Sequence, residues 1–321
     1  MILETTDDLK KYVTVARSFE FNDFEPYITK AVNAFTKRYV GNLHIFLKDE
    51  ANPPEINFEV KNEAREHLRN AIANFGMFIY FPIMSVQIDG SGVSEIKSDQ
   101  RQAVSWGIAK DIRRELLRSG HESMDYLLEV LEKNPDVFAD WTAEFGTINK
   151  KLLVNNTSTF NEYYHIFNSR QTFLALQPTI RQVEDQFIKT MLCSELYEYL
   201  KSEVAGISND VKTEIQKAIV AFTVSKVASI GLFLLDENGL RLNFDVLIDG
   251  RKESITAGKT AEQVSNLVKE LSNNGNQYLS AARELILENR PLFTQCESPL
   301  KQSPSNGTGY TPYDTPGILS L

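Results

Sequence analysis

The chain has few of the residue types that proteins use to hold metal ions or to crosslink the backbone. Its 321 residues include two cysteines and four histidines. Two cysteines are too few for a disulfide framework or a zinc site, so Cys193 and Cys296 are predicted to be reduced thiols. The histidines form no H-E-x-x-H pattern; Glu63 and His67 lie one helical turn apart, which is more typical of a solvated helix pair than of a metal site. We therefore expect no metal and no cofactor.

Basic charge and long apolar runs are also scarce. Lys and Arg number 34 against 43 Asp and Glu, which gives a formal net charge of −9. Nucleic-acid binders usually have a basic surface, so no sequence-specific nucleic-acid binding is expected. The most apolar run, Phe75 to Ile83, has half of the ~18 residues that a membrane helix needs. Met1 to Lys10 lacks the apolar region of a secretion signal. These features predict a soluble protein without a membrane partner.

The motifs of nucleotide, calcium and nucleophile chemistry are all incomplete. Glu95 stands where a dinucleotide fingerprint starting at Gly90-Ser91-Gly92 needs its third glycine, and a carboxylate replaces the first glycine of a phosphate loop ending at Gly258-Lys259-Thr260. Asp89 and Asp236 lack the glutamate that a calcium loop has at its twelfth position. There is no Gly-x-Ser-x-Gly nucleophile elbow. The sequence therefore predicts that the protein is not an enzyme.

An internal repeat is the main organising feature. The apolar positions of residues 21–35 recur at 173–187 with an offset of 152. Those of residues 68–83, with the turn at 88–93, recur with an offset of 147, and those of residues 109–138 with an offset of 155. The shared order and spacing predict a tandem duplication. We assign residues 1–150 to repeat 1, 151–295 to repeat 2 and 296–321 to a C-terminal arm.

Each repeat is expected to be mainly helical. Its first long helix is predicted to begin at Pro26 or Pro178, because proline suits the first helical turn. A second apolar helix is expected to end near Pro82. The hairpin signals Asp-Gly-Ser-Gly and Asp-Glu-Asn-Gly predict protruding β-hairpins at 86–96 and 233–248. Two more helices per repeat are predicted, at 98–118 and 124–133 in repeat 1 and at 260–272 and 278–289 in repeat 2. Aromatic residues at helical spacing are expected in the core: Phe35, Phe75, Trp106 and Phe222.

The C-terminal arm has a different composition from the repeats. It holds four prolines and three glycines in 26 residues, which excludes a helix and is typical of a flexible tail. It also contains aromatic and aliphatic residues that a linker does not need, which favours a docking arm. The candidate interaction residues of the hairpins and the arm are Asp89, Gly92, Asp236, Gly239, Phe244, Tyr310, Tyr313, Ile318, Leu319 and Leu321.

Three segments carry a family resemblance: Leu9-Lys10-Lys11-Tyr12-Val13, Asp23 to Gly41 (DFEPYITKAVNAFTKRYVG), and Asn62 to Ile83. They resemble the short L-K-x-Y-L-like helix, the longer helix ending in Y-x-G and the third apolar helix of the all-helical head-to-tail connector (adaptor) proteins of tailed bacteriophages. The duplicated form with its I-D-x-x-G turn is similar to an uncharacterised family of Bacteroidetes phages and prophages. The second copy departs from the pattern, because it has Cys193-Ser194 in place of Tyr-x-Gly.

The resemblance implies a structural virion protein, assembled in the bacterial host cytoplasm. Such connectors form a ring, usually of twelve subunits, that joins the portal to the tail at the neck and lets DNA pass. A doubled subunit would close a similar ring with six copies. The expected partners are therefore further copies of the chain, the portal and tail or neck proteins. Three alternatives stay open: another neck or tail structural protein, a cytoplasmic helical-repeat interaction module, and an enzyme whose site is assembled from distant residues, with Glu63 and His67 as its candidates.

Overall fold

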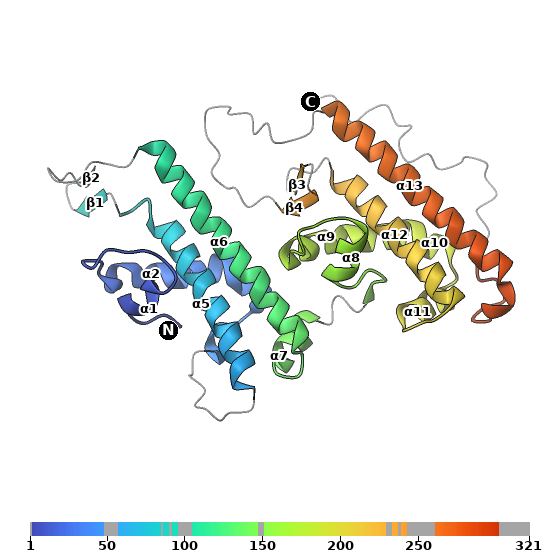
Figure 1. Cartoon of the computed structure of the whole chain (residues 1–321), viewed down its shortest axis with the longest axis horizontal. Coiled ribbons are helices and arrows are strands. Elements are labelled where there is room, and N and C mark those ends of the chain that lie inside the picture. The colour runs from blue at the N-terminus through green and yellow to red at the C-terminus, as the bar shows by residue number, and fades with distance from the viewer. Residues whose placement is uncertain are drawn as a thin grey trace.

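The computed structural model describes residues 2–47, 57–84, 86–89, 92–95, 105–146, 151–228, 233–236, 239–242 and 261–301, and the fold is mainly helical (Figure 1). The described residues fall into a first half, residues 2–146, and a second half, residues 151–301. No helix in these ranges combines the length and apolar character of a membrane span.

The first half is built on two long helices preceded by a series of short ones. In chain order its elements are α1 (Thr6–Lys10), α2 (Phe21–Ala31), the π-helical turn η1 (Val32–Thr36), α3 (Lys37–Val40), α4 (Leu43–Phe46), α5 (Phe58–Tyr80), β1 (Val86–Asp89), β2 (Gly92–Glu95), α6 (Trp106–Lys133), α7 (Ala139–Trp141) and the π-helical turn η2 (Thr142–Gly146).

The second half follows a similar order. Its elements are α8 (Thr157–Tyr163), α9 (Arg170–Val183), the π-helical turn η4 (Glu184–Ile188), α10 (Lys189–Met191), α11 (Ser194–Lys201), α12 (Ile207–Val227), β3 (Phe233–Asp236), β4 (Gly239–Leu242), α13 (Ala261–Glu288) and the 3₁₀ turn η5 (Arg290–Leu292). The π-helical turns η1 and η4 lie at the same relative position in the two halves.

The helices stack side by side in one series. α2 packs on α5 and α5 on α6; α6 then contacts α9, which packs on α12, and α12 packs on α13 (Figure 1). Each half has its own core of buried apolar side chains, one formed by residues between Ile2 and Phe138 and the other by residues between Leu152 and Leu300. The chain thus forms two helical layers in contact, each with its own core, and Leu174 of the second half packs against the core of the first.

The same aromatic contact lies at the centre of each core. The rings of Phe35 and Phe75 stack with centroids 4.3 Å apart and an interplanar angle of 8°, and those of Phe187 and Phe222 stack with the same distance and angle. Phe75 and Phe222 are both buried. The core positions predicted for Phe75 and Phe222 are confirmed, while the side chain of Trp106 lies outside the described residues.

Two predicted helix boundaries are wrong for a shared reason. α6 and α13 are single helices of 28 residues, where the sequence predicted two helices separated near Gly120 and Gly275. Both glycines lie inside the helix, and each faces a phenylalanine ring: a Cβ added at Gly120 would lie 2.5 Å from Phe75 Cε1, and one at Gly275 would lie 2.7 Å from Phe222 Cε1. Each glycine therefore makes room for a core ring rather than ending a helix.

The predicted starts of α2 and α9 are also wrong. Pro26 and Pro178 lie inside these helices, which begin at Phe21 and Arg170. Ser169 caps α9, because its side chain accepts a hydrogen bond from the backbone N–H of Thr172 at 3.1 Å. A proline past the first turn removes one backbone hydrogen bond, a cost that the apolar faces of both helices offset by packing into their cores.

Both strand pairs are antiparallel, and β4 packs against its own half. Asp89 lies opposite Gly92 in the first pair, and Asp236 opposite Gly239 in the second. The backbone N–H of Leu240 donates to the carbonyl oxygen of His165 at 3.0 Å, and the side chain of Leu240 is fully buried. The prediction of a protruding hairpin is therefore wrong for β4, because its apolar residues pack towards α9.

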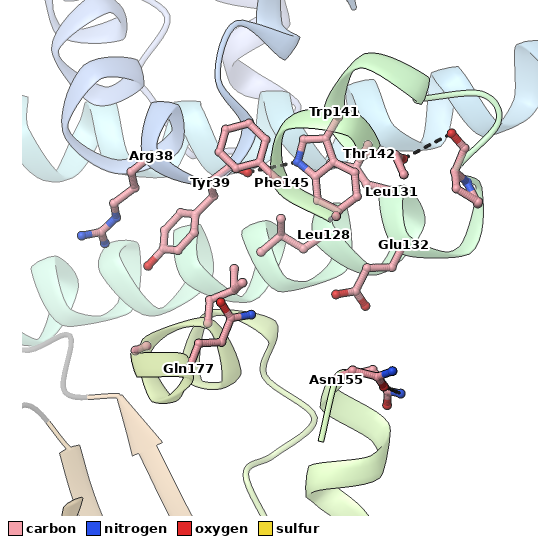
Figure 2. Close-up of a pocket in the computed structure, with 15 residues that line it drawn as sticks. Arg38, Tyr39, Leu128, Leu131, Glu132, Trp141, Thr142, Phe145, Asn155 and Gln177 are labelled. Carbon is pink, nitrogen blue, oxygen red and sulfur yellow. Dashed lines mark hydrogen bonds between the residues drawn. The ribbon is translucent and has the colours of Figure 1, made fainter. Parts of the chain in front are cut away.

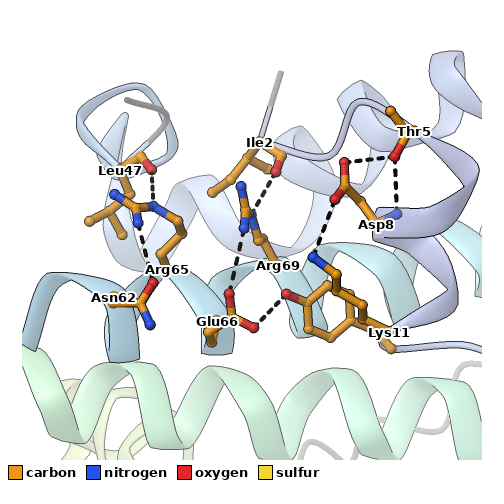
Figure 3. Close-up of polar contacts among 10 residues, drawn as sticks. Ile2, Thr5, Asp8, Lys11, Leu47, Asn62, Arg65, Glu66 and Arg69 are labelled. Carbon is orange, nitrogen blue, oxygen red and sulfur yellow. Dashed lines mark hydrogen bonds and ion pairs between the residues drawn. The ribbon is translucent and has the colours of Figure 1, made fainter. Parts of the chain in front are cut away.

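Polar side chains of α5 fasten the N-terminal residues to the first half (Figure 3). Arg69 Nε donates to the carbonyl oxygen of Ile2 at 2.9 Å. The hydroxyl of Tyr12 donates to Glu66 Oε2 at 2.7 Å. Arg65, whose side chain is buried, donates to the carbonyl oxygen of Leu47 at 2.8 Å and so holds the end of α4. These contacts place the short N-terminal helices along α5.

A disulfide joins Cys193 to Cys296, so the prediction of reduced thiols is wrong. The two residues are 103 positions apart, and a count of cysteines gives no information on their separation in space. Residues 296–301, assigned to the arm from the sequence, also pair with the second half through their backbone. The N–H of Cys193 donates to the carbonyl oxygen of Pro299 at 3.0 Å, and that of Lys301 donates to the carbonyl oxygen of Met191 at 2.8 Å.

Candidate interaction surface

The junction between the halves is formed by α6 and the start of α9, and several polar contacts cross it. The first turn of a helix leaves backbone N–H groups without partners, and these favour an acceptor of negative charge. Asp125 on α6 fills this role, because its Oδ1 accepts the backbone N–H of Gln171 at 2.9 Å. Burial raises the pKa of Asp125 above its usual range, against the hydrogen bonds that it accepts from α9. The first half therefore caps a helix of the second.

An ion-pair cluster continues the junction along α6. Arg170 at the start of α9 places Nη1 3.2 Å from Glu129 Oε2 and Nε 3.3 Å from Glu132 Oε2. Its side chain is 8% exposed, so the guanidinium charge is buried between the halves. A hydrogen bond from Lys133 and the charge of Arg170 hold the pKa of Glu129 below its usual range. Asp125, Glu129 and Glu132 thus form an acidic stripe on α6 that binds α9.

A buried histidine and a glutamine make the third contact of the junction. His121 Nδ1 lies 2.8 Å from Gln171 Oε1, and Gln171 Nε2 donates to the carbonyl oxygen of His121 at 2.8 Å. The rings of Phe35 and Phe75 pack on the imidazole. Burial lowers the pKa of His121 to about 4, although the contact with Gln171 acts in the opposite direction. The imidazole is therefore neutral at pH 7 and acts as a structural link.

Beside the polar contacts lies a cavity of about 630 Å³ between the halves (Figure 2). Its wall is largely apolar and aromatic, and the indole N–H of Trp141 is already used, donating to the carbonyl oxygen of Tyr39 at 3.0 Å. The guanidinium of Arg38 lies 4.7 Å from the centre of the Tyr39 ring. The lining includes Arg38, Tyr39, Leu128, Glu132, Trp141 and Leu174.

Few ionisable side chains line the described part of the cavity. Among its described lining residues, the ionisable side chains are Arg38, Tyr39 and Glu132. Glu132 already pairs with Arg170, and burial raises the pKa of Tyr39. General acid–base chemistry needs a group that titrates near neutral pH within reach of a substrate. Burial also raises the pKa of Glu132, against its ion pair with Arg170.

Four of the interaction residues predicted from the sequence lie in the described part of the chain, in the strand pairs. Asp89 and Gly92 lie in the first strand pair, and Asp236 and Gly239 in the second. Gly239 has a φ of +146°, and a side chain there would overlap the carbonyl oxygen of His165. The other six predicted residues lie outside the described residues: Phe244, Tyr310, Tyr313, Ile318, Leu319 and Leu321.

His67, one of the two residues considered for a metal, packs on a second ring. The ring of His67 stacks on that of Tyr126 with centroids 5.5 Å apart, and burial lowers its pKa. In the described residues, the ligand atoms of Cys193, Glu195 and Cys296 lie within 4.8 Å of one another, but the disulfide occupies both thiols. The two cysteines, which were predicted to be separate thiols, are thus paired with each other.

No pattern in the sequence marked the junction residues as an interface. Asp125, Glu129 and Glu132 have the i, i+4, i+7 spacing of a solvated helix face, and a buried partner charge was not visible from α6 alone. Arg170 precedes the predicted start of its helix at Pro178. A correct helix start would have placed Arg170 in the first turn of α9.

Comparison with known proteins adds one partial match. Residues 34–146 match the model of a family of unknown function (DUF6712). The match covers less than half of the chain, and in the structure it extends from η1 to the end of η2. No curated protein and no solved structure matches the chain.

Proposed function

We propose that the protein is a structural component of a tailed-phage virion, assembled in the bacterial host cytoplasm, that forms a ring at the neck, joins the portal to the tail and lets DNA pass. One observation carries the proposal: two similar helical layers stack in series through a contact between unlike faces, α6 on one side and α9 on the other. A unit of this kind is suited to assembly with further copies. The resemblance of residues 9–83 to the all-helical connectors is the reason for proposing the connector ring rather than another assembly.

The finer architecture of the proposal is a tandem duplication of a connector-like domain. Support comes from the equal stacking geometry of Phe35 on Phe75 and Phe187 on Phe222, and from the glycines that face these rings in α6 and α13. In this proposal the first hairpin, β1–β2, and the arm after Lys301 contact adjacent subunits or the portal. The role is structural and uses no cofactor.

The charge balance agrees with a channel for DNA. A surface that DNA must slide past should not bind phosphates tightly, and a net charge of −9 on each copy repels the nucleic acid. The partners in this proposal are therefore proteins: copies of the chain, the portal, and tail or neck proteins.

The native mass of the purified protein tests the proposal. We expect a species of six or twelve copies, visible as rings in electron micrographs, or a stoichiometric complex with the portal from the same genome. Truncation after Lys301 should weaken assembly and leave helicity unchanged, because residues up to Lys301 pair with Met191 and Cys193. A monomer that ignores the portal would contradict the proposal.

A cytoplasmic interaction module is the second candidate, and the cavity between the halves favours it. An apolar cavity of about 630 Å³ with aromatic walls has the size of a ligand site. This candidate predicts a monomer that binds a peptide, and a Leu174→Trp variant, which fills the cavity, should abolish that binding.

A further inference from the structure

The series of helices has two ends, and each end presents a helix face to solvent. α2 packs on α5 at one end, and α13 packs on α12 at the other, so neither helix is covered on its outer side by the described part of the chain (Figure 1). The contact between α6 and α9 joins two different surfaces, so it is a head-to-tail contact. A series built from such contacts has an unoccupied surface of the α6 type at one end and of the α9 type at the other.

The outer side of α13 corresponds to the junction side of α6. Gly120 and Gly275 face equivalent phenylalanine rings, which aligns α6 with α13 at an offset of 155. At this offset Asp125, Leu128, Glu129 and Glu132 correspond to the α13 end face, which we define as Ser280, Arg283, Glu284 and Leu287. All four end-face residues are exposed, and Leu287 has 53% of its surface in solvent. A large apolar side chain is thus exposed at the position where α6 contacts Arg170.

The outer side of α2 corresponds in the same way to the start of α9. Phe35 and Phe187 stack on equivalent rings, which aligns the two segments at an offset of 152. Residues 169–177 then correspond to residues 17–25. We define the α2 end face as Arg17, Asn22, Asp23 and Glu25, all of which are exposed.

The charges of the two end faces are complementary. In the α6–α9 contact, Glu129 pairs with Arg170. The equivalent docking places Glu284 at Ser18, the counterpart of Arg170, next to Arg17 in the chain. It places Arg283, the counterpart of Leu128, opposite Asp23 and Glu25, because Leu128 shares a cavity with their counterparts in α9. Within the described residues, none of these five side chains forms an ion pair, so all five charges are available to a partner.

We propose that the α13 end face binds the α2 end face of a second copy of the chain, in the arrangement by which α6 binds α9. The inference rests on the proposed function, because it names the surfaces through which the ring would assemble. Each chain then offers one face of each kind, so copies add head to tail, and the geometry of the contact decides whether the series closes.

Charge reversal on full-length protein tests the contact. Arg283→Glu and Glu25→Arg should each raise the concentration of half-dissociation about tenfold or more, because each brings like charges together. The double variant Arg283→Glu with Glu25→Arg should restore assembly. Glu270→Arg is the matched control, since Glu270 is an exposed residue of α13 that corresponds to Glu115, outside the junction. Native mass spectrometry gives the readout, and circular dichroism verifies the fold of each variant.

The outcomes separate the inference from the proposed function. A wild-type oligomer that both single variants leave intact overturns the end-face contact while the ring proposal stands. A double variant that folds but stays dissociated, like the single variants, also overturns the pairing. A wild-type protein that is monomeric with and without the portal overturns both. Loss in the single variants, recovery in the double variant and no effect in the control support the contact.

Discussion

At the scale of single residues, two glycines determine how closely the long helices approach. A glycine inside a helix costs roughly 0.5–1 kcal/mol relative to alanine, so its presence needs a compensating contact. In the first half that contact is the Phe75 ring, which occupies the space of a Cβ on Gly120, and Phe222 does the same at Gly275. Each ring stacks on a second phenylalanine, so the glycine, the core ring and its partner form one unit in each half.

Replacing Gly120 by alanine should destabilise the first half by about 1–3 kcal/mol, because the added methyl overlaps the Phe75 ring and the core has to shift. Gly107→Ala is the control on the same helix, since an added Cβ there meets nothing within 4 Å. The control should be neutral or slightly stabilising. Urea unfolding followed by circular dichroism measures both. Equal stability of the two variants would show that the ring can move aside without cost.

His121 should make stability depend on pH in the acid range. Its pKa is about 4 in the folded state against 6.5 when exposed, so between these values the unfolded chain binds more protons. Stability should therefore fall as the pH decreases from 6.5 to 4, by up to about 3 kcal/mol. Asp125 acts in the opposite sense, because its raised pKa favours the folded state on acidification.

Asn at position 121 keeps an amide donor without titrating, so His121→Asn should remove the histidine contribution. Unfolding curves of both proteins across this range measure the difference, and equal slopes would contradict the assignment.

At the scale of elements, the sequence predicted the apolar helices better than their ends. The spacing of apolar residues located α5 and α12 and identified Phe75 and Phe222 as core residues, because burial of one stripe imposes that period. It failed at Gly120 and Pro178, since a glycine that receives a ring and a glycine that ends a helix look alike in one sequence. The same holds for Cys193 and Cys296, whose pairing depends on how α11 and the segment after η5 lie in space.

The disulfide should stabilise the second half and hold residues 296–301 against it. Closing a loop of 103 residues restricts the unfolded state, and a loop of about 100 residues corresponds to a gain of up to about 4.7 kcal/mol. Cys193→Ser, or reduction of the wild-type protein, should lower the unfolding temperature of the second half. Limited proteolysis should then cut near residues 296–301 sooner than in the oxidised protein. Thermal unfolding with and without reductant measures the effect. If the disulfide is the cause, reductant should leave the unfolding temperature of Cys193→Ser unchanged.

At the scale of the whole molecule, the recurring apolar pattern of the sequence predicted two similar halves but not how they meet. Such a pattern reports the contacts that both halves share, such as the stacked phenylalanines. The junction contacts occur once, between Asp125 on one side and Gln171 on the other, so no comparison of the halves with each other could find them. Arg170 was missed for the same reason, although its charge decides which face of α6 is covered.

Arg170→Glu should separate the halves without unfolding them. The substitution places a third carboxylate beside Glu129 and Glu132 and removes the cation that both contact. A hydrogen bond to a charged group contributes roughly 1.5–3 kcal/mol, so the loss is large relative to a junction that consists of few contacts. Small-angle X-ray scattering should show a larger radius of gyration at unchanged helicity. Arg118→Glu is the control, because Arg118 pairs with Glu115 and Glu122 on the same helix with 61% of its side chain exposed. Unchanged scattering by Arg170→Glu would mean that the apolar wall of the cavity, with Leu128 and Leu174, holds the halves together without the ion pairs.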